Sequence, residues 1–332
     1  MSMQNRKVLI TGGAGFIGSH LAERLVQRGD EVFVLDDLST GDRANVAHLE
    51  VGPRFHFVEG SIFAGERLLE LVGTCDQVVH LAAAVGVQYI LDHPLSSIST
   101  NIEGTQRVLE TCNRFRKKVM IASTSEVYGN QNHAPLVETD GSVYGSSGKA
   151  RWSYAASKLM DEFLALAYHR THGLEVVIVR FFNTVGPRQT GRYGMVVPRF
   201  VRQALAGEPV TVYGTGHQSR TFTHVGDTVR AVEALLDTPR AVGEVVNVGG
   251  VEEVTIQHLA ERILAKTGSC SAIRHIPYEE AFATGFEDME RRVPGLDKLE
   301  GLVGFRPETG LEAILDDVIA YELNAARVVG QA

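Results

Sequence analysis

The chain has 332 residues, of which 44% are hydrophobic and 22% are charged, as is typical of a soluble globular protein. With 40 acidic and 32 basic side chains its net charge is −8, which argues against a nucleic-acid-binding protein, because contacts with phosphates need a basic face. The three cysteines, Cys75, Cys112 and Cys270, are far apart and form no CxxC pair, so neither a zinc centre nor a disulfide framework is supported.

The first residues of the chain run directly into an apolar segment at 7–11 and lack the layout of a secretory signal peptide. No stretch reaches the ~20 apolar residues that a membrane-spanning helix needs. We therefore expect a cytoplasmic protein with no membrane partner and no metal.

The first half of the chain alternates short apolar runs with longer segments of helical period. The runs are rich in Val and Ile and apolar throughout, as expected for parallel strands buried on both faces. Strands are predicted at 7–11, 31–35, 55–58, 77–82, 118–123 and 175–180. Helices are predicted at 16–28, 94–115 and 152–172. This alternation predicts βαβ units and a doubly wound sheet.

After Arg180 the alternation breaks, and Gly and Pro cluster over 183–199. Shorter elements follow, with helices predicted near 195–206, 226–237, 255–266 and 309–326 and strands at 210–213 and 244–248. We therefore expect a dinucleotide-binding domain over 1–180 and a smaller substrate-binding subdomain over 181–332, with some segments crossing back and the substrate cleft between the two.

A glycine-rich turn joins the first predicted strand to the first predicted helix. Gly12, Gly15 and Gly18 have the spacing G-x-x-G-x-x-G, which permits a tight turn, backbone approach to a pyrophosphate and close packing of helix on strand. The helix N-terminus would offer free N–H groups to the phosphates. Asp36, at the end of the second strand, can accept the ribose hydroxyls of NAD and repel the 2′-phosphate of NADP. A plain tight turn with a capping acid is the alternative; the full combination favours NAD.

Tyr154 and Lys158 lie four residues apart in a predicted helix, so their side chains share one face. A tyrosine with a pKa of about 10 is a poor base, but a nearby ammonium lowers that pKa. We expect Tyr154 to take a proton from a sugar hydroxyl while hydride leaves to NAD. An ordinary surface pair is the alternative, and the position downstream of the dinucleotide turn favours catalysis.

Thr124, Ser125 and Glu126 follow the fifth predicted strand. Open α/β sheets bind ligands at the carboxyl ends of their strands, so these side chains are expected to face the cleft. The alternative is a helix cap or turn, which Ser and Thr also favour.

Together with further segments, these motifs make the chain resemble the extended short-chain dehydrogenase/reductases of the nucleotide-sugar epimerase/dehydratase family. The matching segments are TGGAGFIGSH (11–20), VVHLAAAV (78–85), NIEGTQRVLE (101–110), STSEVYG (123–129), YAASK (154–158), RFFNTVGPR (180–188), VYGTGHQSRTFTHVGD (212–227) and VNVGG (246–250). The resemblance implies an α/β fold, a Rossmann-type doubly wound parallel sheet with a smaller C-terminal α/β subdomain. It also implies tightly held NAD, a nucleoside-diphosphate sugar and a homodimer formed by the two long helices.

Three segments resemble UDP-glucuronate decarboxylases, both the UDP-xylose synthases and the decarboxylase domain of the aminoarabinose pathway. Thr-Ser-Glu at 124–126 is similar to their strand-end motif, whereas hexose 4,6-dehydratases have Thr-Asp-Glu, so Ser125 disfavours dehydration. ARWSYAASK (150–158) and GFEDMERRVPGL (285–296) are the other two. In the latter, the family has an arginine before x-Pro that enters the active site, here Arg292. A solvated Arg291–Arg292 pair is the alternative.

The resemblance implies decarboxylation of UDP-glucuronate through a 4-keto intermediate, giving UDP-4-keto-pentose, UDP-xylose or both. Once C4 is oxidised, the C6 carboxylate belongs to a β-keto acid, which loses carbon dioxide to leave an enolate. Tyr154 and Thr124 would hold the C4 oxygen, and Arg292 would steady the charge and relay a proton with Ser125. Glu126 would either repel the substrate carboxylate or pair with Arg292.

The expected site falls into three groups. The catalytic residues are Tyr154, Lys158, Thr124, Ser125, Glu126 and Arg292. The cofactor-binding residues are Gly12, Gly15, Phe16, Ile17, Gly18, Asp36, Asp37, Ser61, Ile62, Leu81, Ala82, Ala83, Asn101, Tyr154 and Lys158. The substrate-binding residues are Val85, Asn183, Arg188, Arg192, Val197, Tyr213, Arg220 and Arg292, with Arg220 as the phosphate-binding arginine. Two positions depart from the family pattern: Met195 stands where xylose synthases have arginine, and Ser61 replaces an adenine-contacting aspartate.

Two other functions remain open from the sequence. A UDP-glucuronate 4-epimerase needs the same oxidation, followed by rotation of the keto sugar, and Glu126 with Arg292 is the feature that favours decarboxylation over it. A non-catalytic NAD-sensing protein on the same fold would be expected to have lost the Tyr154–Lys158 pair, which is intact.

Overall fold

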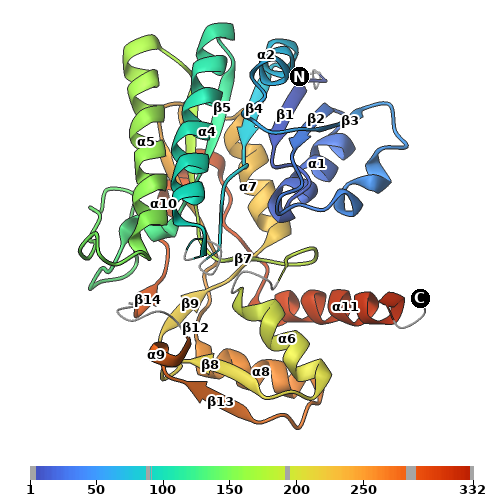
Figure 1. Cartoon of the computed structure of the whole chain (residues 1–332), viewed down its shortest axis with the longest axis vertical. Helices are drawn as coiled ribbons and strands as arrows, with labels where there is room; N and C mark the ends of the chain where they lie inside the picture. Colours follow the sequence, from blue (N-terminus) through green and yellow to red (C-terminus); the bar gives the residue numbers. More distant parts are fainter. Residues whose placement is uncertain (1–4, 87–89, 91, 191–194, 282–288, 330–332) are drawn as a thin grey trace.

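The computed structural model describes residues 5–86, 90, 92–190, 195–281 and 289–329. Its larger part is built on one sheet of seven strands in the order β11-β6-β5-β4-β1-β2-β3 (Figure 1). All neighbouring strands in it are parallel. Its strands are β1 (Lys7–Thr11), β2 (Glu31–Asp36), β3 (Phe55–Glu59), β4 (Gln77–His80), β5 (Lys118–Thr124), β6 (Val176–Phe181) and β11 (Val245–Val248). The expected α/β fold with a doubly wound parallel sheet is confirmed.

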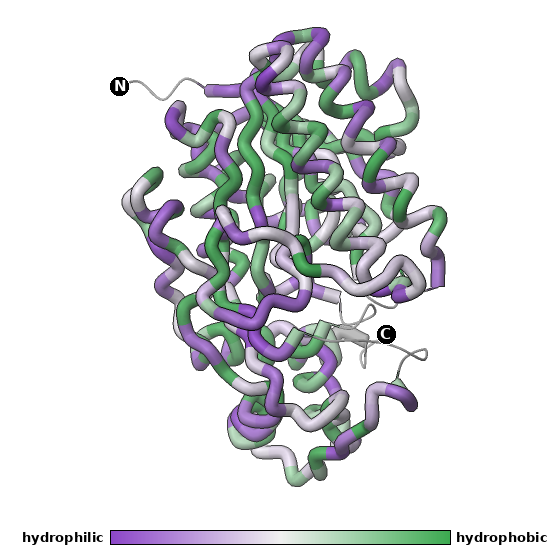
Figure 2. The backbone as a smooth tube through the Cα atoms, turned by 90° about the vertical axis from the view of Figure 1, so that its left-hand side faces the viewer, coloured by the Kyte–Doolittle hydropathy of each residue, from purple (hydrophilic) through white to green (hydrophobic). Residues whose placement is uncertain are grey.

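Both faces of this sheet are buried, as the uninterrupted apolar runs predicted, and its strands are coloured predominantly hydrophobic in Figure 2. Alternate residues of each strand belong to different cores. Val8 and Ile10 of β1 face one core and Leu9 faces the other. The helices over the first core are α1 (Phe16–Arg28), α7 (Val225–Asp237) and α10 (Asp297–Val303). Those over the second are α2 (Gly65–Thr74), α4 (Pro94–Phe115) and α5 (Trp152–His172).

The smaller part lies below the large sheet in Figure 1 and has its own apolar core. Its helices are α6 (Val196–Ala206), α8 (Ile256–Thr267), α9 (Tyr278–Ala281) and α11 (Leu311–Val329). A three-stranded sheet holds β12 (Glu253–Thr255), β9 (Ser219–Thr221) and β14 (Arg291–Arg292), and a second pairs β8 (Val210–Tyr213) with β13 (Ile273–Ile276). Between the two parts, β7 (Thr184–Val185) pairs with β10 (Thr223–His224).

The predicted strands and long helices occur within about three residues of their expected ends, but several elements were not predicted. The strands β7, β9, β10, β12, β13 and β14 have two to four residues each, which is too short for a periodic pattern to emerge. Helix α2 begins at Gly65 and contains Gly73, and glycine is a poor helix former.

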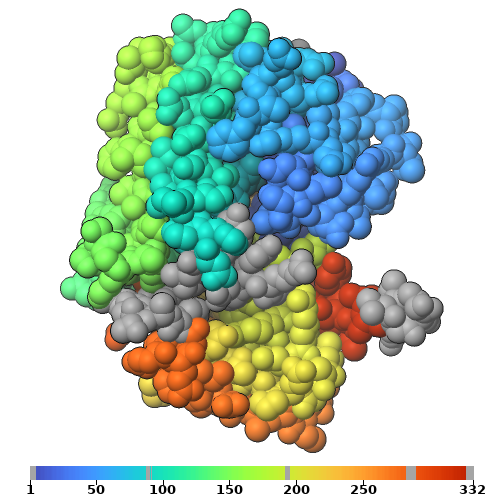
Figure 3. Space-filling model, in the orientation of Figure 1, coloured from blue at the N-terminus to red at the C-terminus, as the bar shows by residue number. Residues whose placement is uncertain are grey.

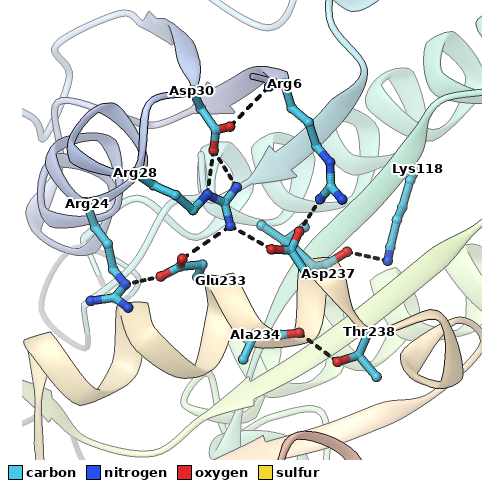
Figure 4. A network of polar contacts seen from close by, with 10 residues as sticks. Arg6, Arg24, Arg28, Asp30, Lys118, Glu233, Ala234, Asp237 and Thr238 are labelled. Carbon is cyan, nitrogen blue, oxygen red and sulfur yellow. Dashed lines mark hydrogen bonds and ion pairs between the residues drawn. The ribbon is translucent and has the colours of Figure 1, made fainter. Parts of the chain in front are cut away.

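Part of the second half of the chain crosses back onto the first. Strand β11 pairs with β6 in the large sheet, and α7 packs beside α1, where ion pairs join the two helices (Figure 4). Arg28 of α1 contacts Asp237 of α7 at 2.7 Å and Glu233 at 3.2 Å, and it also contacts Asp30 at 2.8 Å. These contacts lie at the end of the sheet where β2 begins, away from the carboxyl ends of the strands.

The long helices α4 and α5 lie side by side on the outside of the molecule (Figures 1 and 3). They leave large apolar side chains in solvent, with Leu95 83%, Met160 46% and Phe163 61% exposed. Among the described residues, no helix is long and apolar enough to cross a bilayer, and no cluster of three His, Cys, Asp or Glu side chains is placed to hold a metal ion.

Candidate active site

The glycine-rich turn packs against the carboxyl end of β4. Gly12 has φ +74°, a conformation that side chains disfavour, and a Cβ there would lie 2.7 Å from the backbone nitrogen of Ala82. A Cβ on Gly18 would lie 2.3 Å from the carbonyl oxygen of Gly12, so α1 and the turn need glycine to pack this closely. At Gly15, setting aside its chain neighbours, the one atom of the described residues within 4 Å of a Cβ is the Gly12 oxygen, at 3.2 Å. The middle glycine therefore faces space that a ligand can enter.

Asp36, at the end of β2, lies against the same glycine-rich turn. Asp36 accepts hydrogen bonds from the backbone nitrogens of Ala14 and Leu38, both at 2.9 Å. Burial raises the pKa of Asp36 above its usual value, although these backbone hydrogen bonds act in the opposite direction. Asp37 is exposed and accepts from the Ser39 nitrogen at 3.1 Å. The open face at Gly15, the start of α1 and the Asp36 carboxylate fit a dinucleotide.

The remaining predicted cofactor residues surround the same region. Phe16 and Ile17 form the first turn of α1, Ser61 and Ile62 follow β3, and Leu81, Ala82 and Ala83 follow β4. Asn101 of α4 is buried; its Oδ1 accepts from the Ala84 nitrogen at 2.9 Å, and its Nδ2 donates to Ser157 Oγ at 3.2 Å. Asn101 thereby ties the loop after β4, which also carries Val85, to α5.

The Tyr154–Lys158 pair lies on α5 as expected, with Lys158 almost completely buried. Burial and the nearby Glu126 carboxylate raise the pKa of Tyr154, whereas a hydrogen bond with Thr124 and the charge of Arg292 lower it. The net shift is upward, so Tyr154 is protonated at neutral pH. The surface-pair alternative does not describe Lys158, whose ammonium donates to Asp161 Oδ2 at 2.7 Å.

Thr124, the last residue of β5, combines a turn cap with a contact to the predicted site. Thr124 caps the short 3₁₀ turn Ser125–Tyr128, because its Oγ1 accepts from the Glu126 nitrogen at 3.2 Å. The same side chain hydrogen-bonds with Tyr154. Ser125 is 1% exposed and lies at the start of the turn. A structural cap and a contact with Tyr154 therefore coexist in Thr124.

Glu126 lies between two arginines from distant parts of the chain. Arg292 of β14 donates to Glu126 Oε1 and to Asn183 Oδ1. Arg151, directly before α5, donates to Glu126 Oε2 at 3.2 Å, and its side chain is 6% exposed. The solvated-pair alternative applies to Arg291, which is 54% exposed and paired with Glu253 at 2.7 Å, but not to Arg292, which is 12% exposed.

Two of the other predicted substrate residues, Arg220 and Asn183, lie beside this cluster. Arg220 of β9 is buried and stands opposite Arg292 in the β9–β14 register. Asn183 donates to the Thr221 carbonyl at 2.8 Å, and the Arg199 guanidinium lies 4.1 Å from the ring centroid of Tyr213.

Val197 and Arg188 lie elsewhere in the structure. Val197 is fully buried in the core of the smaller part. Arg188 contacts Glu23 at 2.8 Å and Ser19 at 3.4 Å. Both partners are on α1, so Arg188 lies beside the helix that follows the glycine-rich turn. Arg192 lies outside the described residues.

Known proteins resemble the chain in sequence and in fold. The family profile described as GDP-mannose 4,6 dehydratase matches residues 9–318. The UDP-N-acetyl-alpha-D-glucosaminuronate decarboxylase of Bacillus cytotoxicus is 42% identical over 317 residues, which are 95% of this chain and 97% of that protein. The UDP-glucuronic acid decarboxylase 1 of Arabidopsis thaliana is 35% identical over 314 residues, 95% of this chain and 69% of that protein.

The chain belongs to the extended short-chain dehydrogenase/reductase family of nucleotide-sugar epimerases and dehydratases.

Solved structures agree with this family assignment. The dTDP-glucose 4,6-dehydratase of Streptomyces venezuelae, with NAD bound, has a TM-score of 0.87 at 32% identity and covers 96% of this chain and 98% of its own. The UDP-glucuronic acid 4-epimerase of Bacillus cereus, in complex with UDP-glucuronic acid and NAD, has a TM-score of 0.86 at 30% identity, covering 96% and 99%. Within the family, the sequence relatives identify this chain as an enzyme of the nucleotide-sugar decarboxylase type.

Three residues at this family site were not predicted from the sequence. Arg151 lies within the ARWSYAASK segment, where its position three residues before Tyr154 was a usable signal. Asp161, three residues after Lys158, was a second such signal, because side chains at that spacing meet on a helix. His80, at the end of β4, is buried and hydrogen-bonded to Thr11 at 2.7 Å, and its role depends on contacts that the sequence does not show.

Proposed function

We propose that this enzyme decarboxylates a UDP-hexuronate through transient oxidation at C4, with UDP-glucuronate as the substrate that its motifs favour and with UDP-4-keto-pentose, UDP-xylose or both as products. The observation that carries the proposal is the contact of Arg292 with Glu126 beside Thr124 and Tyr154. The pair of Glu126 and Arg292, next to Tyr154, is the feature that favours decarboxylation over 4-epimerisation.

Each of these groups has a chemical task in the proposed reaction. NAD held by the glycine turn, Asp36 and Asn101 would supply the hydride acceptor for C4 oxidation and the donor for any return reduction. Tyr154 takes the proton of the C4 hydroxyl, and the Lys158 ammonium favours the phenolate form. Thr124, already hydrogen-bonded with Tyr154, is placed to hold the C4 oxygen as negative charge develops on it.

Loss of carbon dioxide then depends on the Glu126 cluster. With C4 oxidised, the bond from C5 to the carboxylate breaks and its electron pair moves into the C4 enolate. Arg292, whose charge also acts on Tyr154, would stabilise the charge, while Ser125 and Arg292 would relay a proton to C5. Of the two roles weighed for Glu126, pairing with Arg292 is the one that the contacts support.

Because Glu126 contacts both Arg151 and Arg292, Arg292 can turn to a substrate carboxylate while Glu126 remains paired with Arg151. When a substrate carboxylate competes for Arg292, Glu126 still keeps its contact with Arg151 at 3.2 Å. An isolated carboxylate at this part-buried position would be costly. The two-arginine arrangement therefore suits an anionic sugar.

A second substrate is favoured by the comparison with the Bacillus cytotoxicus enzyme. That relative is 42% identical across nearly its whole length and is named for UDP-N-acetylglucosaminuronate, whereas the relatives named for UDP-glucuronate are 33–37% identical. The two sugars differ at C2, not at C4, C5 or C6, so the same chemistry serves both.

The decisive experiment incubates the purified enzyme separately with UDP-glucuronate and with UDP-N-acetylglucosaminuronate. Carbon dioxide release and mass spectrometry of the products are measured for each. Release from either sugar supports the decarboxylase, and the ratio of kcat/KM values assigns the substrate. Formation of UDP-galacturonate without carbon dioxide would replace this proposal with the 4-epimerase.

We also propose that the enzyme is a symmetric homodimer joined through α4 and α5. Leu95, Met160 and Phe163 would be buried at this contact, which removes a large apolar surface from water.

A further inference from the structure

A buried ion pair lies directly beside the tyrosine base on α5. The Lys158 ammonium donates to Asp161 Oδ2 at 2.7 Å, and the two side chains are 3% and 0% exposed. Lys158 is the cation that is expected to favour the phenolate form of Tyr154. In this structure its charge already has a carboxylate partner within the same helix.

Next to this pair lie polar side chains that carry no charge, those of His80 and Thr105. His80 of β4 is buried, and burial together with the Lys158 charge lowers its pKa to about 3, so the ring is uncharged at neutral pH. Its two ring nitrogens hydrogen-bond with the hydroxyls of Thr11 at 2.7 Å and Thr105 at 3.2 Å. Thr105, on α4, also lies against the Asp161 carboxylate and lowers its pKa by a hydrogen bond.

Glu162, which follows Asp161 on α5, pairs with Arg180 and not with Lys158. Glu162 accepts two hydrogen bonds from Arg180 of β6, at 2.9 and 2.7 Å, and one from Ser123 at 2.5 Å. Its charge adds to the burial that raises the pKa of Asp161, and Lys158 opposes both. The Lys158–Asp161 pair is therefore a separate unit from the Glu162–Arg180 pair.

Three charged groups shift the pKa of Tyr154, and a fourth, Lys158, lies close to it on the same helix. Glu126 and Asp161 raise the pKa of Tyr154, Arg292 lowers it, and Lys158 lies one helical turn away. A cation and an anion in direct contact act on a more distant group as a dipole, whose effect is much weaker than that of either charge alone. Asp161 therefore cancels much of the help that Lys158 can give to ionisation of Tyr154.

We propose that Asp161 is a positioning residue that, by neutralising the Lys158 ammonium, sets the pH at which Tyr154 begins to work as a base. The proposal rests on the proposed function in taking Tyr154 as the base for C4 oxidation. It assigns a role in the reaction to a residue whose side chain is 0% exposed and contacts Lys158. Removal of the carboxylate charge should leave Lys158 free to stabilise the phenolate, so Tyr154 should ionise at lower pH.

The test replaces Asp161 by a neutral side chain of the same shape, Asp161→Asn. Residues seven apart on a helix are about 10 Å apart along its axis. At that distance, with an effective dielectric constant of about 20, loss of one negative charge moves an ionisation by about one pH unit. The expected result is a shift of about one unit toward lower pH in Tyr154 ionisation and in the acid limb of enzyme-bound NADH formation.

Ionisation of Tyr154 is measured without turnover, by ultraviolet difference titration of each protein against the same protein carrying Tyr154→Phe. Asp161→Ser is a second neutral variant for use if Asp161→Asn does not fold. Asp161→Glu keeps the charge and should titrate like the wild type. Asp30→Asn is the matched control, since Asp30 is also buried and paired, with Arg28, but lies at the opposite end of the sheet (Figure 4).

An unchanged titration of Tyr154 in the neutral variants, or a shift toward higher pH, would overturn the role assigned to Asp161. An equal shift in Asp30→Asn would also overturn it. The proposed function fails in a different way, by the absence of carbon dioxide release from the wild-type enzyme, and that result would not alter the titration.

Discussion

Replacement of Arg292 by alanine should separate the oxidation of the sugar from the loss of carbon dioxide. In the proposed reaction hydride leaves from C4, where Tyr154 and Thr124 would act, whereas Arg292 is proposed to act on charge that develops around C5 and C6. The variant removes the contacts of Arg292 with Glu126 and Asn183. Glu126 keeps Arg151 as a partner, so we expect the variant to fold.

The size of the effect follows from the burial of Arg292. A unit charge about 4 Å from developing negative charge, at an effective dielectric constant of about 20, is worth at most about 4 kcal/mol. The side chain is 12% exposed, and water replaces part of that stabilisation, so we expect decarboxylation to slow by about 10²–10³-fold. Oxidation should slow less than about tenfold, because the charge of Arg292 lowers the pKa of Tyr154 less than the hydrogen bond with Thr124 does.

The assay mixes enzyme rapidly with UDP-glucuronate, and in parallel with its 2-acetamido analogue, and follows NADH absorbance and carbon dioxide. In Arg292→Ala, NADH should accumulate on the enzyme while carbon dioxide is delayed. Arg291→Ala is the matched control, because this neighbouring arginine is exposed and contacts Glu253 instead, and it should behave like the wild type. Carbon dioxide release by Arg292→Ala at the wild-type rate would refute the role of Arg292.

Three further predictions concern the base, the cofactor and the assembly. Tyr154→Phe should form no NADH and release no carbon dioxide while melting near the wild-type temperature, and NADH formation at the wild-type rate would exclude Tyr154 as the base. Asp36→Asn should raise the affinity for NADP relative to NAD by about tenfold, or about 1.4 kcal/mol, in equilibrium binding measurements; an unchanged ratio would contradict repulsion of a 2′-phosphate by Asp36. Met160→Glu with Phe163→Glu should convert the dimer to a monomer in solution scattering at micromolar concentration, whereas Val251→Glu, at an equally exposed apolar site away from α4 and α5, should not.

Local features of the sequence determined much of the large sheet. The apolar runs in β1, β5 and β6 and the helical periods of α4 and α5 were visible because each depends on residues close together in the chain. Pro94 marks the start of α4, as is favourable at the first position of a helix. The glycine turn was equally local, since Gly12 and Gly18 are required by contacts within one strand–turn–helix unit and with the end of β4.

Only the tertiary structure decided which distant groups meet. Strand β14 has two residues and no pattern of its own, yet its parallel pairing with β9 brings Arg292 to Glu126, 166 residues away along the chain. Likewise, β11 lies between segments of the smaller part in sequence but completes the large sheet beside β6. The periodicity of a sequence specifies which face of an element is buried, but not the element that covers it. Partners such as Arg292 for Glu126 are selected by the packing of the whole chain, because that packing determines which polar groups are buried and must be paired.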